Sequence, residues 1–135
     1  MHERYHHSRI GQADFQQMSS IYSASRIGFN SAIINDINMR VFEVMACGCF
    51  LLTDRIRDNG FDELFTDGTD LVTYRTDKEM FSLIDYYLGH DEEREKIASA
   101  GHDLVIGKHT YFHRVQSMFN YIAYKFGGAF NELRV

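Results

Sequence analysis

Short apolar segments alternate with stretches of helical periodicity in the first part of the chain. Three segments are predicted to be strands: Arg26–Ser31, Cys49–Thr53 and Leu71–Tyr74. Apolar residues recur at helical spacing between Gln12 and Ser23, and again from Met39 to Gly48. Strands that alternate with helices favour parallel pairing through right-handed crossovers. The pattern therefore predicts an α/β fold, with a Rossmann-like parallel sheet and flanking helices.

The last third of the chain is predicted to be helical. A capping box at Thr76–Glu79 begins one helix, a second runs from Asp91 to about Ile106, and a third begins at Thr110. In the third helix the large apolar residues repeat every three to four positions, and we expect them to face inward. These residues are Val115, Met118, Phe119, Ile122 and Phe126. At the other end of the chain, the residues from 4 to 10 are predicted to form a frayed strand.

The helix from Met39 to Gly48 is apolar on almost every side, which predicts that it is buried. Asn38 is a suitable N-cap, and Gly48 can adopt the left-handed conformation that ends a helix. Arg40 and Glu43 are the exceptions, and at spacing i, i+3 they share one stripe of the helix. Either they neutralise each other in a packed interior, or they face a cleft that holds a polar ligand.

Composition excludes several classes of protein. The chain has 135 residues, 44% of them hydrophobic, which fits one globular domain and excludes a disordered chain. Its 19 acidic and 14 basic side chains lack the basic excess of a nucleic-acid binder. No apolar run approaches the roughly 18 residues of a membrane span, and the first residues do not form a signal peptide, so we expect a cytoplasmic protein. The 2 cysteines, Cys47 and Cys49, are expected to be small buried hydrophobes, and no metal or other cofactor is predicted.

Three motifs carry a family resemblance. Residues 38–48 have the pattern Asn-x-Arg-Val-Phe-Glu-x-Met-Ala-x-Gly, and an apolar strand ending in Thr-Asp follows. Residues 62–74 have Asp-Glu-Leu-Phe-x-Asp-Gly-x-Asp-Leu-Val-x-Tyr, and residues 109–114 have His-Thr-Tyr-x-x-Arg. In this order and spacing they resemble the nucleotide-sugar half of group 1 glycosyltransferases with the GT-B fold, and more narrowly the CgeB-like branch, named after a spore-maturation protein. The likeness extends from about Gly11 to Tyr124.

The resemblance and the residue chemistry together suggest a set of substrate-binding residues. The resemblance implies that Glu43 binds the ribose of a nucleoside diphosphate sugar, as a carboxylate can through the ribose diol. Asn38 and Arg40 lie at the helix N-terminus, where free N–H groups and a guanidinium suit a diphosphate. The family has an acid that contacts the donor sugar at the position of Asn35, and an asparagine can still bond a sugar hydroxyl. Asp54, just after a strand, is a further candidate, because ligands bind at the carboxyl ends of parallel strands.

The sequence does not identify a catalytic residue. No side chain is an obvious nucleophile or general base, and if the reaction retains configuration, as the resemblance implies, the donor's own phosphate could serve as base. The alternative role of Glu43 is structural, as the ion-pair partner of Arg40. For His109 and Arg114 we expect a structural role, in loop hydrogen bonds and packing.

The resemblance covers only the later part of a GT-B C-terminal domain. The family has two earlier strands and a whole N-terminal domain before this part, so residues 1–135 are predicted to be a single, partial domain that lacks its N-terminal partner. Missing strands leave open sheet edges, and a homodimer that covers such an edge is an expectation. Three hypotheses follow: the donor-binding part of a glycosyltransferase, a non-catalytic nucleotide-sugar-binding module, or a structural interaction domain. Asn35 and the missing half favour the last two for this chain alone, whereas Asn38, Arg40 and Glu43 favour the first for the parent protein.

Overall fold

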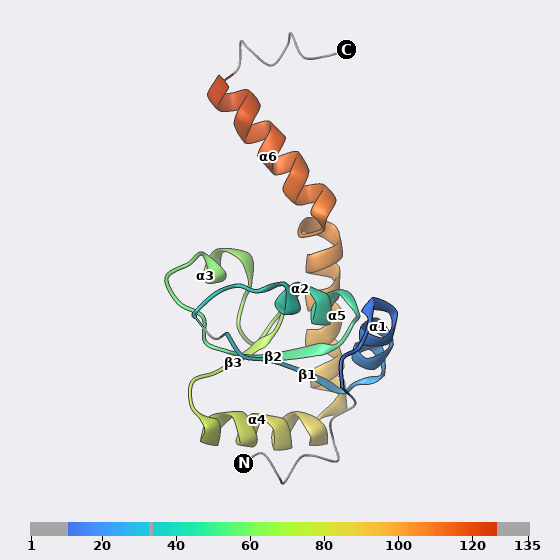
Figure 1. Ribbon diagram of the computed structural model, residues 1–135. Coiled ribbons are helices and arrows are strands. Elements are labelled where there is room, and N and C mark those ends of the chain that lie inside the picture. The colour runs from blue at the N-terminus through green and yellow to red at the C-terminus, as the bar shows by residue number, and fades with distance from the viewer. Residues whose placement is uncertain (1–10, 33, 127–135) are drawn as a thin grey trace.

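The computed structural model describes residues 11–32 and 34–126, and a three-stranded parallel sheet lies at its centre (Figure 1). The strands are β1 (Ile27–Asn30), β2 (Phe50–Asp54) and β3 (Val72–Tyr74), adjacent in that order. The pairing is parallel throughout, with Ile27 opposite Phe50 and Leu52 opposite Val72. The predicted Rossmann-like sheet is confirmed. The strand predicted before Gly11 lies outside the described residues.

The described residues also form six helices. They are α1 (Phe15–Ala24), α2 (Met39–Ala46), α3 (Phe61–Leu64), α4 (Asp77–Gly89), α5 (Asp91–Lys108) and α6 (Tyr111–Phe126). Side-chain hydrogen bonds cap the N-termini of α1 and α4: Gln17 N donates to Asp14 Oδ1 at 2.8 Å, and Glu79 N donates to Thr76 Oγ1 at 3.2 Å. The predicted capping box at α4 is only half formed, because the Glu79 carboxylate accepts from Arg75 N instead of Thr76 N. Gly48, after α2, has a φ of 70°, the left-handed conformation that ends this helix.

Two apolar cores lie on opposite faces of the sheet. Figure 1 shows α2 on one face and α4 on the other. The α2 core includes Val41, Val44 and Leu51, and the α4 core includes Phe50 and Leu52. Alternate residues of β2 therefore point to opposite faces, as the pleat of a strand requires.

Helix α5 contributes to both cores. Its first half places Ile97 and Ala98 in the α4 core, and its second half places Val105 in the α2 core. Figure 1 shows α5 passing the sheet on its way from α4 toward α6. Buried Arg94 fixes the start of this helix, because its guanidinium donates to Tyr87 O at 2.7 Å and pairs with Asp91.

Gly101 of α5 allows this helix to pack closely, so we expect its replacement by alanine to destabilise the fold. A Cβ at this position would overlap the carbonyl oxygen of Asp70 and lie 3.0 Å from Met45 Cε. The backbone oxygen cannot easily move, so the free energy of unfolding should fall by about 1–3 kcal/mol in a urea melt. Gly107→Ala is the matched control, because a Cβ there meets nothing within 4 Å. We expect that variant to be as stable as the wild type or up to ~1 kcal/mol more stable, and equal effects of both substitutions would contradict the close packing.

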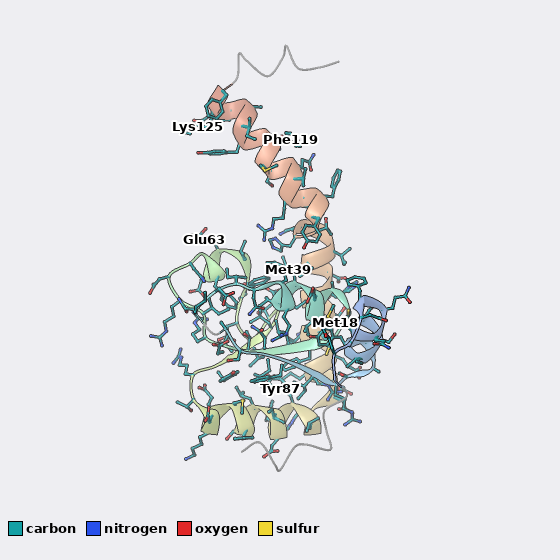
Figure 2. All side chains as sticks on the ribbon, in the orientation of Figure 1. Met18, Met39, Glu63, Tyr87, Phe119 and Lys125 are labelled. Atoms are coloured by element: carbon teal, nitrogen blue, oxygen red, sulfur yellow. The ribbon has the colours of Figure 1, made fainter. Side chains whose placement is uncertain are left out.

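The predicted burial of the α6 apolar face is wrong. Val115, Met118, Phe119 and Phe126 are between 46% and 63% exposed, and no residue of α6 is buried. Figure 1 shows α6 extending away from the sheet, and Figure 2 shows Phe119 far from both cores. The helical period was predicted correctly, but a period shows which face is apolar and does not show what covers it. In the part of the chain that the structure describes, this face stays largely exposed.

None of the described helices combines the length and the apolar character needed to cross a membrane.

Candidate functional site

A polar cleft of about 560 Å³ opens beside the N-terminus of α2. Three elements line this cleft: helix α1, the loop between β1 and α2, and the first turns of α2. We call the second of these loop 31–38; its described residues are 31, 32 and 34–38. The lining residues are Met18, Tyr22, Ser31, Ile34, Asp36, Asn38, Met39, Arg40 and Glu43. The cleft thus includes three of the residues that we predicted from the sequence to bind substrate, namely Asn38, Arg40 and Glu43.

Arg40 and Glu43 share the cleft without pairing with each other. Arg40 is exposed and Glu43 is half-buried, and no ion pair within 4.0 Å joins them. Among the described residues, the Glu43 carboxylate has neither a hydrogen-bond donor nor a cation as partner. The structural alternative, a buried Arg40–Glu43 pair that fixes the helix, is therefore not observed. What remains is a half-buried acceptor in the wall of a cleft.

Asn38 occupies the N-cap position of α2 but does not cap it with its side chain. Its backbone is extended, with φ −76° and ψ 166°, and no hydrogen bond joins its side chain to the first turn. The predicted capping bond is therefore wrong. The Asn38 Oδ1 atom is buried and has no partner among the described residues. This leaves the first N–H groups of α2 without a side-chain cap, and such groups can bind an anion.

Asn35 is engaged with the loop after β2. Its Nδ2 donates to Arg57 O at 2.6 Å, and its Oδ1 accepts from Arg57 N at 2.9 Å. Asn59 Nδ2 donates to the backbone oxygen of Asn35, also at 2.6 Å. Asn35 does not line the polar cleft. The family resemblance implied that this residue contacts the sugar. In the structure, both polar atoms of its side chain form hydrogen bonds with the backbone of Arg57 instead.

Asp54 lies at the carboxyl end of β2, as predicted, and bonds the neighbouring loop. Its Oδ1 accepts from Ala32 N at 2.8 Å and from the Thr53 hydroxyl at 3.2 Å. Thr53 Oγ1 in turn accepts from Asn30 Nδ2 at 3.0 Å, in a fully buried pair. Asp54 does not line the polar cleft either. Its contacts connect β2 to the beginning of loop 31–38.

A second, apolar pocket of about 420 Å³ is lined by residues of α1, α2 and the segment where α5 meets α6. Phe15 and Met18 of α1, Phe42 of α2 and Tyr111 of α6 contribute to its walls. Met18 and Met39 border both this pocket and the polar cleft, and they can be followed in Figure 2. The sequence did not predict this pocket, because its residues carry only the apolar periodicity of ordinary packing faces.

Glu43 borders the apolar pocket as well as the polar cleft. Its carboxylate therefore stands between an apolar and a polar surface. Such a site suits a ligand with both a ring system and hydroxyl groups, because the ring can pack on the apolar side while the hydroxyls donate to the carboxylate.

His109 and Arg114 line the apolar pocket and pack against nearby aromatic residues. The His109 ring lies 6.0 Å from that of Phe42 and 5.8 Å from that of Phe65, measured between centroids. The Arg114 guanidinium carbon lies 5.4 Å from the Phe42 centroid. Burial and then the positive charge of Arg114 lower the pKa of His109, which favours a neutral ring at pH 7. These contacts fit the structural role predicted for both residues.

Among the described residues, no group of three His, Cys, Asp or Glu side chains could hold a metal ion. Cys49 is buried, and this burial raises the pKa of its thiol to about 11. Cys47 is half-buried and borders the apolar pocket.

Comparison with known proteins agrees with the fold. The profile of a family described as glycosyl transferase-like matches residues 2–120, which is most of the chain. The chain belongs to this glycosyl transferase-like family. The predicted glycosyltransferase relationship is thereby confirmed at the level of the family, and its CgeB-like branch stays a prediction.

A solved structure of similar fold is the 1.35 Å crystal structure of the C-terminal domain of a group 1 family glycosyl transferase (LpcC) from Francisella tularensis. It is 21% identical in sequence, with a TM-score of 0.64, and the match covers 75% of this chain and 52% of that one. The glycosyl transferase-like chain therefore spans about half the length of its structural relative. A search of curated proteins finds no match.

Proposed function

We propose that this glycosyl transferase-like chain is the donor-binding part of a glycosyltransferase and holds a nucleoside diphosphate sugar in the polar cleft. The observation that carries the proposal is the half-buried Glu43 carboxylate, which lacks a partner among the described residues. A carboxylate in a cleft wall with no partner keeps its acceptor oxygens available for a ligand. Two ribose hydroxyls would supply the missing donors.

The other residues of the cleft favour an orientation of the ligand in which its ribose contacts Glu43 and its diphosphate lies near Arg40. Arg40 is exposed in the first turn of α2 and forms no ion pair among the described residues, so its guanidinium is available to a diphosphate. The free N–H groups at the start of α2 favour the same negative charge. Asn38, which precedes these N–H groups, lines the cleft as well. In this arrangement the nucleoside lies toward α1 and the diphosphate toward the start of α2.

Sugar transfer requires a second domain to hold the acceptor. The exposed apolar face of α6 supports such a partner, because a large apolar helix face is normally covered in the assembled protein. We propose that an N-terminal glycosyltransferase domain is this partner. The homodimer, the CgeB-like branch and the cytoplasmic location remain predictions.

A second candidate function is a nucleotide-sugar-binding module that does not catalyse transfer. The bonding of Asn35 favours it, because both side-chain polar atoms of this residue are engaged with Arg57 and unavailable to a sugar. The two candidates share the polar cleft and differ in what happens to the bound sugar.

Titration calorimetry on the 135-residue chain tests the shared part of both candidates. We expect UDP, GDP or their glucose and mannose conjugates to bind with a dissociation constant roughly between 1 µM and 1 mM, the usual range for enzyme substrates. Inorganic pyrophosphate and the free nucleosides are the controls, and each should bind more weakly because it fills only part of the cleft. If none of these nucleotides binds, the structural interaction domain is the better account.

A further inference from the structure

Three hydrogen bonds connect loop 31–38 to the loop of residues 55–60 that follows β2. They are the two bonds between the Asn35 side chain and the Arg57 backbone, at 2.6 and 2.9 Å, and the bond from Asn59 Nδ2 to Asn35 O, at 2.6 Å. We call this group the Asn35 clasp. It has no counterpart among the roles that the sequence suggested.

The chemistry of the clasp requires an asparagine at position 35 in two respects. A single side chain must donate to the Arg57 carbonyl and accept from the Arg57 N–H, which an amide can do and an ionised carboxylate cannot. The backbone of Asn35 has a φ of 56°, in the left-handed region that asparagine enters more readily than most residues. Aspartate would keep the backbone conformation and lose the donor.

The clasp holds a loop whose other residues line the polar cleft. On either side of Asn35, the described residues Ile34 and Asp36 line the cleft, and Ser31 and Asn38 line it farther along the same loop. These described residues belong to no helix or strand, so their positions depend on contacts such as those of Asn35. The loop leads straight into α2, whose first turns carry Arg40 and Glu43.

We infer that Asn35 is a positioning residue for the nucleotide: by holding loop 31–38 against loop 55–60, it sets the wall of the polar cleft and the N-terminus of α2. This inference rests on the proposed function, and it gives Asn35 a role without contact to the ligand. The Asp54–Ala32 bond holds the beginning of the same loop, so the loop is fixed to the segment after β2 at two points. A ligand that bridges loop 31–38 and α2 is bound only as well as these two elements are aligned.

Two substitutions at position 35 distinguish the contributions of the two side-chain hydrogen bonds of Asn35. Asn35→Gly removes both side-chain bonds and tolerates the positive φ. Asn35→Asp keeps the acceptor for Arg57 N–H, and it replaces the donor by a carboxylate oxygen facing the Arg57 carbonyl. We expect both variants to bind UDP or GDP roughly 5- to 20-fold more weakly, on the scale of one or two lost hydrogen bonds. Asn120→Asp makes the same chemical change on the exposed surface of α6 and should bind as the wild type does.

Amide hydrogen exchange, measured by NMR, reports on the clasp independently of any nucleotide. The Arg57 amide should exchange faster in Asn35→Gly and stay protected in Asn35→Asp, because only the second variant keeps its acceptor. If Asn35→Gly does not fold, Asn59→Ala removes the outermost bond alone, and its affinity should fall roughly 2- to 5-fold.

The outcomes distinguish this inference from the proposed function. Wild-type affinity in Asn35→Gly, or an Arg57 amide whose exchange does not change, would overturn the positioning role alone. A lower urea midpoint with unchanged affinity would also overturn it, because it shows a purely structural residue. A wild-type chain that binds neither UDP nor GDP overturns the proposed function and, with it, this role of Asn35.

Discussion

Glu43→Gln is expected to weaken the binding of a nucleoside diphosphate by roughly 1.5–3 kcal/mol, the usual contribution of hydrogen bonds to a charged group. In terms of the dissociation constant this is about 10- to 150-fold. Glutamine keeps the shape of the side chain and one acceptor, and it loses the charge that strengthens bonds from the ribose hydroxyls. Titration calorimetry on the wild type and the variant measures the difference.

Stability should respond much less than affinity in this variant. Arg40 is exposed and does not pair with Glu43, so the substitution leaves no buried cation behind. We expect the free energy of unfolding in urea to change by less than about 1 kcal/mol, against about 3–5 kcal/mol for breaking a buried ion pair. Glu63→Gln, on the exposed surface of α3, is the matched control and should alter neither quantity. A large loss of stability at unchanged affinity would show that Glu43 is a structural residue.

The isolated chain is expected to transfer no sugar, even when it binds the donor. The site that we propose would hold the donor only, and alignment of two substrates accounts for roughly five or more orders of magnitude in rate. The measurement is the transfer of radiolabelled sugar from UDP and GDP conjugates to a panel of lipid, peptide and saccharide acceptors. An intact group 1 glycosyltransferase, assayed with the same donors, shows that transfer would be detected.

Glycosyl transfer by the chain alone would contradict this expectation and show that the described residues include an acceptor site. Slow hydrolysis of the donor is a different result, because water needs no acceptor site. The assay should therefore follow the labelled product and not only the release of nucleoside diphosphate.

The sheet could be predicted from the sequence because each strand is a short segment bounded by polar residues. The segment predicted as Cys49–Thr53 forms β2 one residue later, and Leu71–Tyr74 forms β3 except for its first residue. The capping residue of α4 was also predictable, since Thr76 needs only its own helix as partner. Local patterns fix local structure when no distant group competes.

Predictions that depend on distant partners were less successful. The apolar face of α6 was assigned to the core, but none of the described residues of this helix is buried. Asn38 was expected to cap α2, yet its side chain makes no bond to the first turn. The bonds of Asn35 to Arg57 connect residues 22 positions apart, and no sequence period reports such a contact. The sequence showed that Arg40 and Glu43 share one polar stripe of an apolar helix. Whether they form an ion pair or face a cleft could be decided only from the structure.

Helix α5 joins the two faces of the sheet into one unit. Because Ile97 packs with one core and Val105 with the other, neither core can lose its order without disturbing the same helix. Partial unfolding of one layer would also pull Gly101 away from its close contact with Asp70. The sheet has three strands among the described residues. We therefore expect its cooperative unfolding to depend on the helix that both cores share, more than on the breadth of the sheet.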